Sequence, residues 1–164
     1  EQYPHLQNET FTVCNCDNLY SIKALQSLRM SKTSNAFIAY DRDGLRFTIE
    51  RIYRFALVLL NAQNNIVDII EKPSEEQMER YRDRDGKLRV SMNVFKFNGA
   101  DMYPYLRDCP SHPKRDEKEL PTAILNFCED HPGQFLGIPM NEHVPDLTSK
   151  EDIKTFKAYL DKHF

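Results

Sequence analysis

The sequence has no tryptophan, few glycines and no long apolar run. Its five glycines among 164 residues are isolated, which excludes a glycine-rich loop that wraps phosphates with successive backbone N–H groups. No apolar run approaches the ~20 residues that a membrane-spanning helix needs, and residues 1–9 lack the basic and apolar regions of a signal peptide. We therefore expect a cytoplasmic protein that has no membrane partner.

An excess of one charge is also lacking. The formal net charge is −3, from 22 basic and 25 acidic side chains that are mixed along the chain. Nucleic-acid binding is not expected, because it needs a broad basic surface. The length and the 40% share of apolar residues are ordinary for one globular domain.

The four cysteines do not form a metal-binding pattern. Cys14 and Cys16 form C-x-C inside an apolar run, where alternation directs both side chains to one face. Neither C-x-x-C pairs nor histidines at ligand spacing accompany them. We predict reduced thiols in the core, with a metal site and a disulfide as the alternatives.

Strand and helix patterns alternate along most of the chain. Strands are predicted at residues 11–16, 36–40, 55–60, 66–70, 90–97 and 134–139, and helices at 21–30, 74–81, 101–106, 122–129 and 149–163. Residues 55–60 and 66–70 are predicted to form a hairpin, because the asparagines between them tolerate left-handed backbone conformations. The pattern predicts an α/β sandwich around a mainly parallel sheet.

Polar residues at the ends of predicted strands are the first candidates for chemistry, because ligands of open α/β sheets bind beyond the carboxyl ends of the strands. Asp17, the pair Glu71 and Lys72, and Asp146 lie in or near such places. Each of them alone is more typical of a turn, a helix cap or an exposed edge charge. Their order along the chain is more specific than any one of them.

Five segments in register resemble motifs of the sugar-1-phosphate nucleotidyltransferases. FTVCNCDNLY (11–20) resembles the strand that ends in G-D-N, and IVDIIEKP (66–73) is similar to the strand that carries E-K-P. VSMNVFKFN (90–98) resembles N-x-G-x-Y-x-F, EKELPTAI (117–124) resembles E-x-E-I-T-D-A, and VPDLTSKEDI (144–153) is similar to W-x-D-I-G-T-P-E-D-L. The matches cover nearly the whole chain.

The resemblance implies a three-layer, Rossmann-like α/β fold with a mixed, mainly parallel sheet that lacks the amino-terminal strands of the family. Residues 1–164 would be a partial nucleotidyltransferase domain, the sugar-binding half with its carboxy-terminal helix. The implied reaction transfers a nucleotidyl group from a nucleoside triphosphate to a sugar 1-phosphate, forming an NDP-sugar and releasing pyrophosphate. Positioning and charge neutralisation supply most of the catalysis in such transfers.

The resemblance also implies roles for single residues. Asp17 and Asp146 correspond to the carboxylates that hold Mg²⁺, a cation that prefers oxygen ligands. Asp17 and Lys72 would be the catalytic residues, with the Lys72 ammonium on the sugar phosphate. The residues implied to bind substrate are Asn18, Glu71, Lys72, Ser91 and Asn93, of which Glu71 would accept hydrogen bonds from sugar hydroxyls.

The sequence departs from the family pattern in several places. The G-G-x-G-T-R-L loop that holds the triphosphate has no counterpart, so the isolated chain is expected to be inactive. Cys16, Asn93 and Thr148 stand where the family has glycine, and Val144 stands where it has an aromatic residue. One alternative is a catalytically inactive module that binds a sugar nucleotide or regulates a partner. Another is an interaction domain that forms a homodimer through an open sheet edge.

Overall fold

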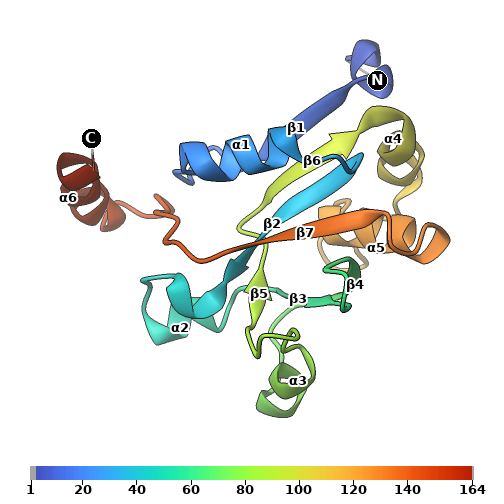
Figure 1. Ribbon diagram of the computed structural model, residues 1–164. Coiled ribbons are helices and arrows are strands. Elements are labelled where there is room, and N and C mark those ends of the chain that lie inside the picture. Colours follow the sequence, from blue (N-terminus) through green and yellow to red (C-terminus); the bar gives the residue numbers. More distant parts are fainter. Residues whose placement is uncertain (1–2, 164) are drawn as a thin grey trace.

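The computed structural model describes residues 3–163, in which a seven-stranded sheet carries helices on both faces (Figure 1). The strands are β1 (Thr10–Cys14), β2 (Asn35–Asp41), β3 (Leu57–Leu60), β4 (Ile66–Ile70), β5 (Arg89–Val90), β6 (Val94–Asn98) and β7 (Phe135–Met140). The helices are α1 (Ile22–Met30), α2 (Ile49–Ile52), α3 (Glu75–Arg80), α4 (Gly99–Asp108), α5 (Leu120–Asp130) and α6 (Asp152–His163), with 3-10 helices η1 (Pro4–Asn8) and η2 (Arg42–Gly44).

The α/β class is confirmed, but the prediction of a mainly parallel sheet is wrong. The strand order is β1-β6-β2-β5-β3-β4, and β7 pairs with β2. Among the strand pairs of residues 3–163, β2 and β7 run parallel and the others run antiparallel. Strand β6 lies between β1 and β2 and runs against both. Alternation of strands and helices along a sequence cannot reveal such an insertion, because it depends on non-local pairing.

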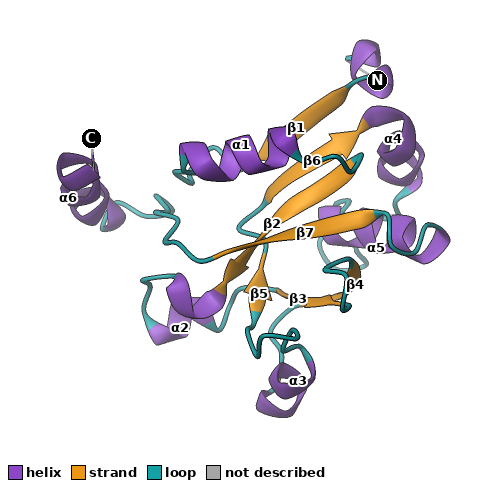
Figure 2. Ribbon diagram, viewed as in Figure 1, coloured by secondary structure: helices purple, strands orange, loops and turns teal. Residues whose placement is uncertain are grey.

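Strand β2 divides the core into two layers. Its side chains alternate between the faces of the sheet, so Ile38 and Tyr40 pack with Leu28 of α1, while Phe37 packs with Phe127 of α5. Every residue of β2 is buried, because strands flank both of its edges and helices cover both faces (Figure 2). This confirms three layers, with β2 at the centre.

Local sequence signals explain most of the helix starts and the hairpin. The Ser21 hydroxyl accepts a hydrogen bond from the Ala24 N–H at the start of α1, and Ser74 forms a complete capping box with Gln77 at α3. In the β3–β4 turn, Asn64 adopts a φ of 63° and the Asn61 side chain accepts from the backbone of residues 63 and 65. These predicted elements are confirmed, while η1 and the short helix α2 were not predicted.

The strand predicted at residues 90–97 is broken into β5 and β6. Met92 and Asn93 adopt φ values of 46° and 52° in the loop between them, a conformation that is uncommon for residues other than glycine. Through this break, β5 pairs with β3 and the end of β2, and β6 pairs with β1 and the start of β2. The loop 91–93 therefore interrupts the ladder between β5 and β6.

The cysteines differ in part from the prediction. Cys109 and Cys128 are buried, and burial raises the pKa of Cys128 to about 12. Cys14 and Cys16 are exposed, and β1, which contains Cys14, is the last strand of the described sheet. The prediction that these two thiols lie in the core was wrong. All four cysteines are free thiols.

After β7 the chain runs through an extended segment to α6, which lies apart from α4 and α5 (Figure 1). No helix within residues 3–163 is long and apolar enough to cross a lipid bilayer.

Candidate functional site

All five motif segments contribute to the wall of one cavity of about 660 Å³. The residues of the motifs that line it are Val13, Asn15, Asn18, Glu71, Lys72, Val90, Ser91, Met92, Asn93, Glu117, Lys118, Glu119, Leu120, Pro121 and Asp146. They come from the end of β1, the end of β4, the β5–β6 loop, the start of α5 and the loop before α6. Six of the seven predicted site residues are thus brought together, and Asp17 is the one that does not line the cavity.

The backbone nevertheless places Asp17 beside Asp146. The carbonyl of Asp17 accepts a hydrogen bond from the Leu147 N–H at 2.8 Å, and the Leu19 N–H donates to the Pro145 carbonyl at 2.9 Å. Asn18 and Asp146 form an antiparallel bridge between these bonds. Two segments that are distant in sequence therefore run side by side at the cavity.

The carboxylate of Asp146 is already engaged by protein groups. Its Oδ2 accepts from the Arg51 guanidinium at 2.7 Å and its Oδ1 accepts from the Thr148 hydroxyl at 2.6 Å. The same guanidinium binds Asp152 at 2.9 Å. Burial lowers the pKa of Arg51, but the hydrogen bonds to Asp152 and Asp146 outweigh burial and raise it.

These contacts decide how well the site fits Mg²⁺. A Mg²⁺ site commonly uses one or two carboxylates together with substrate phosphates. The described residues hold no group of three or more His, Cys, Asp or Glu side chains that could bind a metal ion, and both Asp146 oxygens already have donors. The arrangement therefore does not fit Mg²⁺ while Arg51 stays in place, and Asp17 alone would be a weak ligand.

Lys72 follows the end of β4, lines the cavity and has an unusual backbone. Its φ of 49° is left-handed, a conformation that costs about 1–3 kcal/mol outside glycine and recurs at functional sites. Its ammonium forms no ion pair with any residue of the described chain. Lys72 is thus a cation without an ion-pair partner within residues 3–163, available to the phosphate of a ligand.

Tyr20 holds the β5–β6 loop in place. Its hydroxyl donates to the Met92 carbonyl at 2.7 Å and accepts from the Asn15 N–H at 3.3 Å. The Asn18 side-chain oxygen lies 3.2 Å away. Burial is the main reason why the pKa of Tyr20 is raised far above its ordinary value. The hydroxyl therefore stays protonated and links the loop after β1 to the strained residues 92 and 93.

Two further arginines line the cavity, and the sequence prediction missed both of them. Arg115 lies in the proline-broken loop and pairs with Glu119 and, at 3.7 Å, with Glu71. Arg54 lines the cavity from the segment before β3 and forms no ion pair within residues 3–163. Only the proline-broken loop pointed to Arg115, and no signal in the sequence singled out Arg54.

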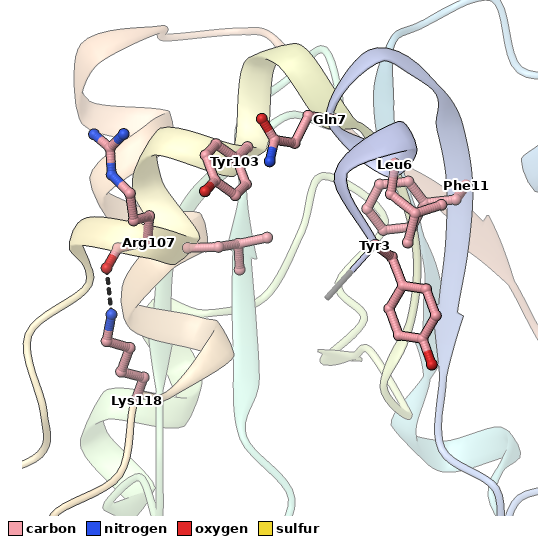
Figure 3. A pocket seen from close by; sticks show the side chains of 9 residues that line it. Tyr3, Leu6, Gln7, Phe11, Tyr103, Arg107 and Lys118 are labelled. Carbon is pink, nitrogen blue, oxygen red and sulfur yellow. Dashed lines mark hydrogen bonds between the residues drawn. The ribbon is translucent and has the colours of Figure 1, made fainter. Parts of the chain in front are cut away.

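A second cavity, of about 590 Å³, lies between η1 and α4 (Figure 3). Tyr3, Leu6, Phe11 and Tyr103 line it, and the Lys118 ammonium donates to the Arg107 carbonyl at one side. None of the predicted site residues lines this cavity. Arg107 and Lys118 also line it, but no acidic side chain among its lining residues could accept hydrogen bonds from sugar hydroxyls.

No model of a known protein family matches the sequence, and comparison with curated proteins finds no match. Solved structures are similar in fold. A protein described as a glucose-1-phosphate thymidylyltransferase from Bacillus anthracis, in complex with sucrose, superposes with a TM-score of 0.64 at 14% identity over 98% of this chain. A UDP-glucose pyrophosphorylase in complex with UDP-glucose superposes with a TM-score of 0.68 at 18% identity, also over 98%.

The chain spans 58% and 60% of the length of these two proteins. At such low identity the likeness concerns the fold and not the activity. Residues 3–163 therefore have the mixed α/β fold found in sugar-phosphate nucleotidyltransferases.

Proposed function

We propose that the cavity binds a sugar 1-phosphate and that the chain is the sugar-binding part of a nucleotidyltransferase. The observation that carries this proposal is the convergence of five motif segments, spread from residue 13 to residue 146, on one cavity. Sequence proximity cannot produce that convergence. The fold shared with two solved structures supports it independently.

The roles follow from the charges in the cavity. Lys72 and Arg54 are cations without an internal partner, so both suit the phosphate of the ligand. Glu71 is exposed and only distantly paired with Arg115, which leaves its carboxylate able to accept hydrogen bonds from sugar hydroxyls. Ser91 and Asn93, in the β5–β6 loop, would form one wall of the sugar site.

In the proposed reaction, a phosphate oxygen of the sugar 1-phosphate attacks the α-phosphorus of a nucleoside triphosphate. The bond to pyrophosphate breaks and an NDP-sugar forms. The residues described here would orient the attacking phosphate. We expect the isolated chain to bind ligand without turnover, because the sequence holds no glycine-rich loop for the triphosphate.

Calorimetric titration with glucose 1-phosphate tests the binding proposal. Lys72→Ala should weaken binding about tenfold, which corresponds to about 1.4 kcal/mol, because it removes the unpaired ammonium. Lys32→Ala is the matched control, since Lys32 is an exposed lysine outside the cavity. Equal affinities of the wild type and the Lys72 variant, or no binding at all, would contradict the proposal. Free glucose and inorganic phosphate distinguish recognition of the sugar from recognition of the anion.

A second candidate is a module that binds sugar phosphate or NDP-sugar and does not catalyse transfer. The engaged carboxylate of Asp146 favours it. Pyrophosphate release by a longer protein that contains this chain separates the two functions. Turnover supports the transferase, and binding without turnover supports the module.

A further inference from the structure

Arg51 joins three parts of the chain. It belongs to α2, and its guanidinium binds Asp146 in the loop before α6 and Asp152 at the start of α6. The guanidinium also lies 4.8 Å from the centre of the Phe47 ring, an attractive arrangement for a cation. The Arg51 side chain is 26% exposed and that of Asp146 is 11% exposed, so the pair is largely shielded from water.

The donors around the two carboxylates leave no oxygen without a partner. On Asp146, Arg51 takes Oδ2 and Thr148 takes Oδ1. On Asp152, Arg51 takes Oδ1, while Oδ2 accepts from the backbone and the hydroxyl of Ser149 at 2.8 and 3.0 Å. The Ser149 backbone and Arg51 both help to lower the pKa of Asp152. Every oxygen of both acids thus has a donor, although the single charge of Arg51 faces two carboxylates.

A divalent cation on Asp146 would have to share its oxygens with these donors or displace them. A cation on Asp146 would lie beside the guanidinium, where like charges repel and water screens them little. The guanidinium cannot lose its charge to make room, because arginine stays protonated in proteins. The planar guanidinium donates to Asp146 and to Asp152 at the same time. A metal ion bound to one carboxylate would not replace both contacts.

We infer that Arg51 occupies the position of a divalent cation at Asp146 and excludes that cation from the Asp146 carboxylate. Ligand phosphate is then neutralised by protein cations, and binding of a sugar phosphate does not need Mg²⁺. The exclusion itself rests only on the contacts of Arg51, whereas its consequence for sugar phosphates rests on the proposed function. The resemblance to the transferase family would lead to the opposite expectation, because it assigns Mg²⁺ to Asp146.

Titration with Mn²⁺ alone tests the exclusion without any sugar. Electron paramagnetic resonance measures the free ion. The wild type should bind no Mn²⁺ at the site. Arg51→Gln should gain one bound ion, because it frees the carboxylates of Asp146 and Asp152, and adding Asp146→Asn to that variant should abolish the gain. Arg46→Gln is the matched control, since it removes one positive charge from an exposed neighbour without touching either carboxylate.

Two results would overturn the inference. One is a wild-type Mn²⁺ site that Asp146→Asn removes, and the other is a folded Arg51→Gln variant that gains no site. A variant that only lost structural support for α6 would not acquire an ion, so the gain separates exclusion from a purely structural role. If Arg51→Gln does not fold, the wild type and its Asp146→Asn variant still test the first of these results.

The consequence for the ligand is measured separately, with glucose 1-phosphate in the presence of EDTA and of Mg²⁺. We expect the same affinity within about twofold, and a tenfold gain with Mg²⁺ would overturn the inference. Absence of glucose 1-phosphate binding in both solutions would contradict the proposed function, and the Mn²⁺ result would still decide the exclusion.

Discussion

Replacement of Tyr20 by phenylalanine removes the hydroxyl that links two loops of the cavity. The lost contacts are the 2.7 Å bond to the Met92 carbonyl and the 3.3 Å bond from the Asn15 N–H. The ring itself keeps its packing, so the change isolates the hydroxyl. Because Met92 and Asn93 hold left-handed conformations, the loop depends on outside contacts to stay in place.

The magnitude follows from the number and the burial of the lost bonds. One strong and one weaker hydrogen bond at a half-buried group correspond to about 1–2 kcal/mol of unfolding free energy. For a domain of this size, each kcal/mol lowers the melting temperature by about 2–4 °C. Affinity for glucose 1-phosphate should fall as well, since the β5–β6 loop forms part of the cavity wall.

Urea unfolding and calorimetric titration measure the two effects. Tyr53→Phe is the control, because Tyr53 is exposed and its hydroxyl has no hydrogen bond within the described residues. The reasoning fails if Tyr20→Phe changes the unfolding free energy no more than the control does. It also fails if stability falls while the affinity stays at the wild-type value, since the loop would then not shape the site.

Two further predictions concern pH and assembly. Burial, followed by the charge of Arg46, lowers the pKa of His143, so the neutral ring favours the folded state. The contribution of His143 to stability is then fully present above the pKa of histidine in the unfolded chain, about 6.5. This contribution falls as the pH drops below that value, by about 1 kcal/mol if the hydrogen bond from the Arg46 N–H is lost. Urea unfolding near pH 7 and pH 5 should show this loss in the wild type and a smaller one in His143→Gln; equal losses would contradict the assignment. Separately, β1 is the last strand of the described sheet and exposes Thr10, Thr12 and Cys14, so a homodimer through this edge should appear as a concentration-dependent mass in light scattering, and a constant monomer mass would exclude it.

The start of α1, the capping box of α3 and the β3–β4 hairpin could be predicted because each depends on residues within a few positions of one another. Ser21, Ser74 and the asparagines at positions 61 and 64 satisfy neighbouring backbone groups, and the sequence alone contains that information. The motif residues could be recognised for a different reason, because short segments of the sequence resemble motifs of a known family.

Tertiary structure decided what those residues do together. The insertion of β6 between β1 and β2, which overturned the mainly parallel sheet, is a pairing between distant segments. The engagement of Asp146 by Arg51 depends on how α2 meets the start of α6, and no spacing in the sequence brings those two residues together. The sequence thus determined the local elements and the candidate acids. Three-dimensional packing determined that one of those acids, Asp146, is already paired with Arg51.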